Sequence, residues 1–116
     1  MTTTEIDFAL PVSFTLVRQA GNDQLVRADG GGHYRLEGPS VVAASWSGPQ
    51  KAELWHHHNT GAGFQWRKLA EFNGGGGATV RVGAKPGEKV VVYVRPAATP
   101  SDVAEDHRGT LTIYPV

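Results

Sequence analysis

The stretch Val12-Ser-Phe-Thr-Leu-Val17 alternates apolar and polar side chains, and the stretch Gly77-Ala-Thr-Val-Arg-Val82 repeats the pattern. A period of two places successive side chains on opposite faces of a β-strand, so that one face meets a core and the other meets solvent. Helical spacing is nearly absent from the rest of the chain. The two stretches therefore predict an all-β protein built from half-buried antiparallel strands.

Seven further stretches predict additional strands, for a total of about eight or nine. They are Gln24–Ala28, His33–Glu37, Ser40–Ser47, Lys51–His58, Phe64–Phe72, Glu88–Arg95 and Thr110–Tyr114. Segments rich in Gly and Pro separate them and predict the turns. The spacing predicts a single antiparallel β-sandwich, Ig-like or jelly-roll-like, that covers residues 1–116 as one domain. The stretch Val90–Val94 lacks polar alternation and is expected to be a central strand covered on both sides.

The composition excludes several classes of function. The 116 residues carry 11 basic and 11 acidic side chains, so we expect neither a nucleic acid nor a membrane as partner, since both need clustered positive charge. The absence of Cys excludes disulfides, a thiol nucleophile and thiolate zinc sites. The first residues show no basic region followed by an apolar run, from which we expect no signal peptide.

The tract His56-His57-His58 is the most conspicuous polar cluster. In a strand, His56 and His58 project to one face and His57 to the other, and two imidazoles on one face are a frequent part of metal sites. A zinc site needs at least a third ligand, and the remaining candidates cannot be placed from the sequence: His33, His107, Asp106 and Glu53. We therefore predict no metal, with His56 and His58 as the candidate ligands if one is bound.

The three tryptophans, Trp46, Trp55 and Trp66, raise the possibility of sugar binding, because an indole face matches the C–H face of a sugar ring. Trp46 and Trp66 lie within apolar stretches, so we expect them in the core. Trp55 is the better candidate for exposure, with Asn59 in the following turn as a hydrogen-bonding partner for a glycan. Three buried rings would favour packing, whereas an exposed pair on one concave face would favour sugar.

Motifs for catalysis are missing from the sequence. The chain has no Gly-x-Ser-x-Gly elbow and no His-Glu-x-x-His pair. The glycines of residues 74–77 lead into a predicted strand, whereas a phosphate-binding loop opens a helix. We therefore predict a protein that is not an enzyme and uses no cofactor.

The middle of the chain, over about residues 41–95, has a recognisable order of segments. The segments are Ala44-Ser-Trp-Ser-Gly48, Lys51-Ala-Glu-Leu54, Phe64-Gln-Trp-Arg-Lys-Leu-Ala-Glu-Phe72, Ala78-Thr-Val-Arg-Val82 and Gly87-Glu-Lys-Val-Val-Val-Tyr-Val-Arg95. This order resembles small β-sandwich proteins of tailed bacteriophages, which occur as capsid decoration, head-fibre and tail-fibre modules. The histidine tract and the segment from Ala97 to His107 depart from that pattern.

The resemblance implies a structural accessory protein of the virion that acts through protein contacts. Its partners would be a capsid or tail structural protein and further copies of itself, in a homo-oligomer such as a trimer. It implies no catalytic residue. The alternative from the residues themselves is a carbohydrate-binding β-sandwich module that uses exposed Trp side chains, with Trp55 and Asn59 at the site.

Overall fold

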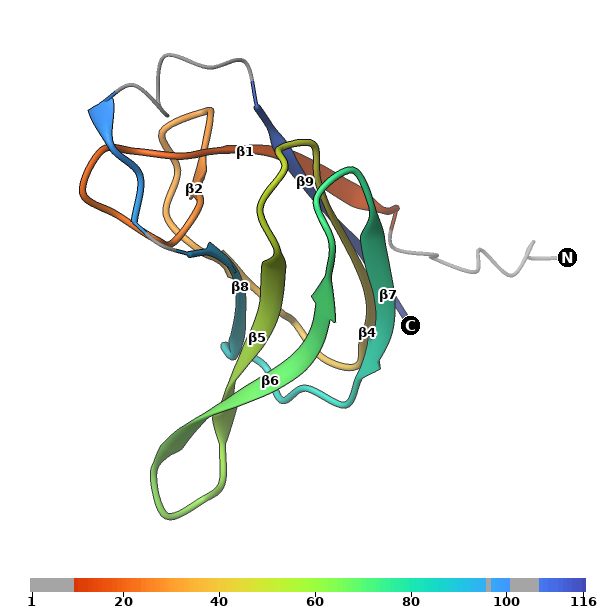
Figure 1. Cartoon of the computed structure of the whole chain (residues 1–116). Helices are drawn as coiled ribbons and strands as arrows, with labels where there is room; N and C mark the ends of the chain where they lie inside the picture. The colour runs from red at the N-terminus through yellow and green to blue at the C-terminus, as the bar shows by residue number, and fades with distance from the viewer. Residues whose placement is uncertain (1–9, 96, 101–106) are drawn as a thin grey trace, which may run out of the picture.

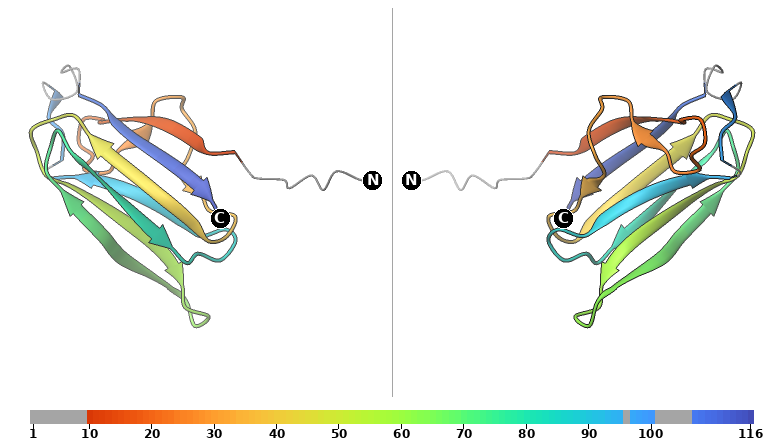
Figure 2. Two further views of the ribbon diagram at one scale, coloured as in Figure 1. Left: turned by 90° about the vertical axis from the view of Figure 1, so that its right-hand side faces the viewer. Right: turned by 90° about the vertical axis from the view of Figure 1, so that its left-hand side faces the viewer.

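The structure is a computed structural model that describes residues 10–95, 97–100 and 107–116. Within these residues, nine β-strands form two antiparallel sheets that pack face to face (Figures 1 and 2). The all-β sandwich predicted from alternation is therefore confirmed. The described part of the chain holds no helix that is long and apolar enough to span a membrane.

One sheet has five strands in the order β2-β1-β9-β4-β7. Their bounds are β1 (Val12–Val17), β2 (Val26–Arg27), β4 (Ser40–Trp46), β7 (Gly77–Val82) and β9 (Gly109–Pro115). The other sheet has four strands in the order β3-β8-β5-β6. Their bounds are β3 (Tyr34–Arg35), β5 (Ala52–Asn59), β6 (Phe64–Phe72) and β8 (Lys89–Val94).

Most strands match their predicted bounds to within a residue or two, but β2 and β3 are much shorter than predicted. The cause is that the chain changes sheets within this segment. The N–H of Leu25 donates to the carbonyl of Val92 in the four-stranded sheet at 2.9 Å, whereas Val26 already pairs with Val17 in the five-stranded sheet. Side-chain alternation does not reveal which sheet a residue joins, so the sequence could not predict this crossing.

The core lies between the two sheets and follows the alternation of each strand. In β4, Val42, Ala44 and Trp46 are buried, and β9 and β5 add Ile113 and Leu54. Strand β8 buries three consecutive residues, Val90–Val92, so it is covered on both faces as its sequence predicts.

The hairpin of β5 and β6 is the most extended feature and projects past the other strands (Figures 1 and 2). Asn59 pairs with Phe64 across the turn, where the Thr60 N–H donates to the Gly63 carbonyl at 2.8 Å. Gly61 has a φ of 87°, which L-residues with a side chain rarely adopt. Strand β6 is an edge of its sheet, and residues 64–68 are all exposed.

Leu54→Ala tests the core assignment. Leu54 is fully buried, so truncation should lower the free energy of unfolding by about 2–5 kcal/mol, from lost burial and the cavity left behind. The same substitution at Leu10, which is 79% exposed, should change it by less than about 0.5 kcal/mol. Urea denaturation measures both, and equal effects at the two positions would contradict the assignment.

Candidate functional site

The outer face of the four-stranded sheet gathers most of the exposed aromatic side chains. Along β5, Leu54 and His56 are buried between the sheets, so Trp55 and His57 point outward. Cross-strand partners share a face, which places Trp66 beside His57. We call this surface the aromatic face; its rings belong to Trp55, His57, Phe64, Trp66 and Tyr93.

Three of these rings form a continuous stack at the hairpin end of the face. The His57 ring lies 4.4 Å from the Phe64 centroid, with 19° between the planes, and 4.5 Å from the Trp66 centroid, with 27° between the planes. Phe64 is 58% exposed and Trp66 is 45% exposed. His57 therefore covers one face of the Trp66 indole, and the Lys89 ammonium lies over the same ring, 5.7 Å from its centroid.

A hollow of about 230 Å³ lies beside this stack, lined by Trp55, Trp66, Tyr93 and Arg95. Trp55 and Tyr93 meet edge to face, with centroids 6.3 Å apart, and the Arg95 guanidinium lies 4.7 Å above the Tyr93 ring. Burial, together with the Asp23 carboxylate, raises the pKa of Tyr93 against the opposing effect of Arg95, so its hydroxyl stays protonated at neutral pH. The hollow is therefore an aromatic site with hydrogen-bond donors at its border.

Charged side chains form a polar rim on the same face. Glu53 accepts a hydrogen bond from the Trp55 indole N–H at 2.9 Å. Its carboxylate also lies 3.8 Å from the Lys68 ammonium and 3.6 Å from the Arg95 guanidinium. These contacts hold Trp55 in one orientation.

The positions of the three tryptophans correct part of the sequence prediction. Trp46 is buried in the core as expected. The expectation that Trp66 is also buried is wrong, because Trp66 lies on the edge strand β6 and faces outward. Trp55 does point outward, but it is only partly exposed, and Trp66 is the more open ring.

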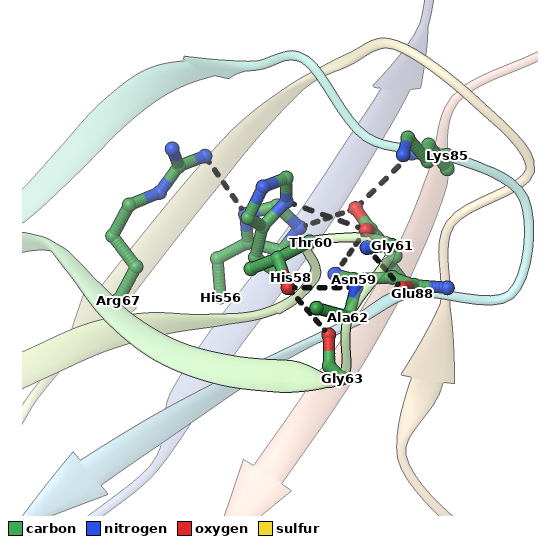
Figure 3. Close-up of polar contacts among 10 residues, drawn as sticks. All are labelled: His56, His58, Asn59, Thr60, Gly61, Ala62, Gly63, Arg67, Lys85 and Glu88. Carbon is green, nitrogen blue, oxygen red and sulfur yellow. Dashed lines mark hydrogen bonds and ion pairs between the residues drawn. The ribbon is translucent and has the colours of Figure 1, made fainter.

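Behind the aromatic face, the buried side chains of His56 and Glu88 form a cluster with the partly buried side chain of His58 (Figure 3). The Glu88 side chain is only 1% exposed, yet its carboxylate accepts from the His56 ring at 2.8 Å and from the backbone N–H of Lys85 at 3.1 Å. Its second oxygen accepts from the N–H of Asn59 and lies 3.3 Å from Nδ1 of His58. The carboxylate thus ties β5 to the loop that precedes β8.

The hydrogen bonds fix the charge of both partners. Burial alone would raise the pKa of Glu88, but the Asn59 and Lys85 N–H groups and the His56 ring outweigh it and lower that pKa to about 2. Burial lowers the pKa of His56, and the Arg67 guanidinium and His58 add to this effect while Glu88 opposes it. The pair is therefore a carboxylate and a neutral imidazole at pH 7.

The ligand atoms of His56, His58 and Glu88 lie within 4.8 Å of one another, close enough to consider a metal ion. However, Nδ1 of His56 lies 3.1 Å from the Arg67 guanidinium, which can only donate. Nδ1 must therefore accept, and the imidazole proton resides on Nε2, where it is donated to Glu88. A metal at Nε2 would displace this proton, and metal-bound histidines normally donate their other N–H to an acceptor, which a guanidinium is not. The donor set therefore disfavours a metal.

The other predicted ligands do not join this cluster. His33 hydrogen-bonds the Gln24 side chain at 2.8 Å, and Glu53 belongs to the rim of the aromatic face. The His107 ring lies 6.0 Å from that of Trp46. Asp106 lies outside the described residues. The third member of the cluster, Glu88, was missed because 29 residues separate it from Asn59, so only the fold brings them together.

Asn59, the predicted glycan contact, has its side chain engaged in the hairpin turn. Its Oδ1 accepts from the N–H of Gly61 at 2.9 Å. The residues that sequence reasoning missed on the aromatic face are His57, Phe64, Tyr93 and Arg95. A signal for two of them was available, because the turn after Asn59 sets a register in which His57 faces Trp66 and Asn59 faces Phe64.

Comparison of the sequence with protein-family models finds no matching family, and comparison with curated proteins finds no matching relative. The resemblance to bacteriophage sandwich proteins therefore stays a prediction from the sequence.

Glu88→Gln should destabilise the protein at pH 7, because the amide would place a donor against one of the N–H groups that now bond the carboxylate. We expect a loss of about 1–3 kcal/mol in the free energy of unfolding, measured by urea denaturation. The folded pKa of about 2 lies below the ordinary value of 4.5, so the contribution of Glu88 is complete above pH 4.5 and disappears as the pH falls toward 2. The difference between wild type and variant should shrink over that range.

Glu37→Gln, at an exposed carboxylate, is the matched control and should behave as the wild type throughout. A constant difference between wild type and Glu88→Gln from pH 6 to pH 2 would contradict the role assigned to the charged carboxylate.

Zinc should not stabilise the protein, because the His56 Nε2 proton and Arg67 occupy the positions that a ligand imidazole needs. A metal present at 100 times its dissociation constant would add about 2.7 kcal/mol to the free energy of unfolding. We expect the midpoint of thermal unfolding to be the same with Zn²⁺ and with a chelator. A zinc-dependent rise that Glu88→Gln abolishes would show the cluster to be a metal site.

Proposed function

We propose that this chain is a non-enzymatic binding module that takes a glycan on its aromatic face. The observation that carries the proposal is the hollow lined by Trp55, Trp66, Tyr93 and Arg95 on an outward-facing sheet surface. The exposed ring of Trp66 and the partly exposed ring of Trp55 lie beside one hollow, and this arrangement favours sugar over packing. The rings and the rim supply the two contacts that a sugar needs.

The stacking contact comes from the part of the Trp66 indole that lines the hollow and from the edge-to-face pair of Trp55 and Tyr93. Sugar C–H groups form an apolar face of matching size. A cavity of about 150 Å³ accepts a benzene ring, so the hollow of about 230 Å³ has room for one sugar ring. Such a ring would lie against aromatic surface and leave its hydroxyls at the border.

The hydrogen-bonding contact comes from the rim. The Glu53 carboxylate accepts from donors, and the Arg95 guanidinium and Tyr93 hydroxyl donate, so sugar hydroxyls find both kinds of partner. Existing contacts also hold the site: Trp55 is bonded to Glu53, and Trp66 is stacked on His57. Side chains that are already ordered lose little conformational entropy on binding, which favours affinity.

The virion accessory role, with its homo-oligomer and capsid or tail partner, is a separate proposal. One feature favours self-association: β6 is a nine-residue edge strand with exposed Phe64 and Trp66. Edge strands offer unpaired backbone groups to another chain. The charges on β6 at Arg67, Lys68 and Glu71 oppose such pairing, and for this reason we place glycan binding first.

Trp66→Ala should weaken glycan binding at least about tenfold, which corresponds to about 1.4 kcal/mol, because the stacking surface is lost. Stability should change little, since Trp66 is 45% exposed. A glycan array identifies the ligand, and titration calorimetry measures its affinity. Tyr114→Ala, which removes a 43% exposed aromatic ring from β9 in the other sheet, is the matched control and should bind as the wild type.

An array with no hits for the folded wild-type protein would remove the proposal. Equal loss of affinity in Trp66→Ala and Tyr114→Ala would move the site away from the aromatic face.

A further inference from the structure

A row of four side chains crosses the aromatic face, one from each strand. Arg35 in β3 pairs with Lys89 in β8, Lys89 pairs with His57 in β5, and His57 pairs with Trp66 in β6. Direct cross-strand partners project to the same side of a sheet, so all four share the aromatic face. With about 4.8 Å between strands, the backbone positions of Arg35 and Trp66 are about 14 Å apart.

The Arg35 and Lys89 end of the row concentrates positive charge. Like charges at directly opposed positions of two strands destabilise a sheet, so this pair opposes folding unless something neutralises it. Among the described residues, no carboxylate forms an ion pair with either side chain. This charge acts on the neighbouring His33. Burial makes the largest contribution to lowering the pKa of His33, and the charges of Lys89 and Arg35 lower it further.

The other cations of this face differ from this pair. Lys68 lies within ion-pair distance of Glu53 and Glu71, and Arg95 of Glu53 and Asp23. Lys68 and Arg95, with their carboxylate partners, lie at one end of the aromatic face. Arg35 and Lys89, which have no carboxylate partner within the described ranges, lie in the row that contains Trp66. The Lys89 ammonium lies 5.7 Å from the centre of the Trp66 ring, so it can reach a substituent of a sugar ring bound there.

We infer that the aromatic face binds an acidic glycan, whose ring stacks on Trp66 and whose carboxylate or ester-linked sulfate or phosphate lies between Lys89 and Arg35. This inference rests on the proposed glycan binding and names its ligand class. The anionic group supplies the counter-charge that the row lacks among the described residues. The row also sets the order of the subsites across the sheet: an aromatic subsite at Trp66 on β6, and a cationic subsite at Lys89 on β8 and Arg35 on β3.

A single-stranded nucleic acid also combines rings with negative charge, but the face is less suited to it. Nucleic-acid grooves follow the phosphate backbone with continuous positive charge. Here Glu53 and Glu71, which pair with each other across β5 and β6, place carboxylates on the same face. A glycan has hydroxyls to donate to these carboxylates and carries its charge at isolated positions.

The test uses the full chain on an array that contains both neutral and acidic glycans, followed by titration calorimetry with the strongest ligand. We expect the hits to be acidic, and Lys89→Gln and Arg35→Gln each to weaken binding at least about fivefold at low salt. Binding should also weaken between about 0.01 M and about 1 M salt, because the Debye length falls from about 30 Å to about 3 Å. Arg81→Gln, at an exposed arginine of β7 in the other sheet, should bind as the wild type.

Chemical removal of the charge from the same ligand identifies its source. Methyl esterification abolishes binding through a carboxylate, and desulfation or phosphatase treatment abolishes binding through an ester; either loss supports the inference. Neutral hits that depend on Trp66 but not on Lys89 or Arg35 would overturn it and leave glycan binding intact. No glycan hits at all, or binding of oligo(dT) in their place, would overturn both.

Discussion

The buried Glu88 carboxylate is the contact on which the candidate site depends. It collects donors from two segments far apart in the sequence: the end of β5, through His56 and Asn59, and the loop before β8, through Lys85. Because a carboxylate can only accept, its burial is tolerable only when each oxygen meets N–H groups. Asn59 begins the hairpin turn, so the carboxylate fixes the point at which β5 stops. Because the strand end is fixed by the contact between Glu88 and Asn59 on the inner side, His57 is placed opposite Trp66 on the outer side.

This polar contact also explains how a hairpin can project past the rest of the sandwich. At that end, the inner side chains His56, His58 and Arg67 occupy positions that apolar residues occupy further along β5, such as Leu54. A histidine and glutamate pair bonded on several sides can be buried without apolar partners, whereas an exposed aliphatic strand would favour collapse or aggregation. The aromatic rings of the hairpin can therefore lie on its outer side, because polar side chains already occupy the inner positions.

Alternation and turn residues predicted the sheets well because both are local signals. The β-strand bounds of Phe64–Phe72 and the two faces of His56 and His57 follow from neighbouring residues alone. The candidate site depends on pairing between segments that are distant in the sequence, and local patterns do not predict such pairing. Nothing local distinguishes Glu88 from an exposed glutamate at a turn. Trp66 was expected in the core although Gln65 and Arg67 flank it, because the sequence does not reveal that β6 is an edge strand. The turn after Asn59 sets the pairing of β5 with β6, and this pairing between strands could have been predicted from the sequence.

The net charge of the chain likewise does not predict where the charges lie in the folded protein. Eleven basic and eleven acidic side chains gave a total of zero, from which we expected neither a nucleic acid nor a membrane as partner. A total is insensitive to placement. In the described part of the chain, carboxylates lie within ion-pair distance of Lys68 and Arg95 at one end of the aromatic face, and none lies within that distance of Arg35 or Lys89 at the other end. A neutral chain therefore carries a local positive pair of short range, since salt screens it within about 8 Å under physiological conditions. Such a pair can bind one anionic group beside a stacked ring, but it cannot attract a polyanion over its length, which is the distinction between a charged sugar and a nucleic acid.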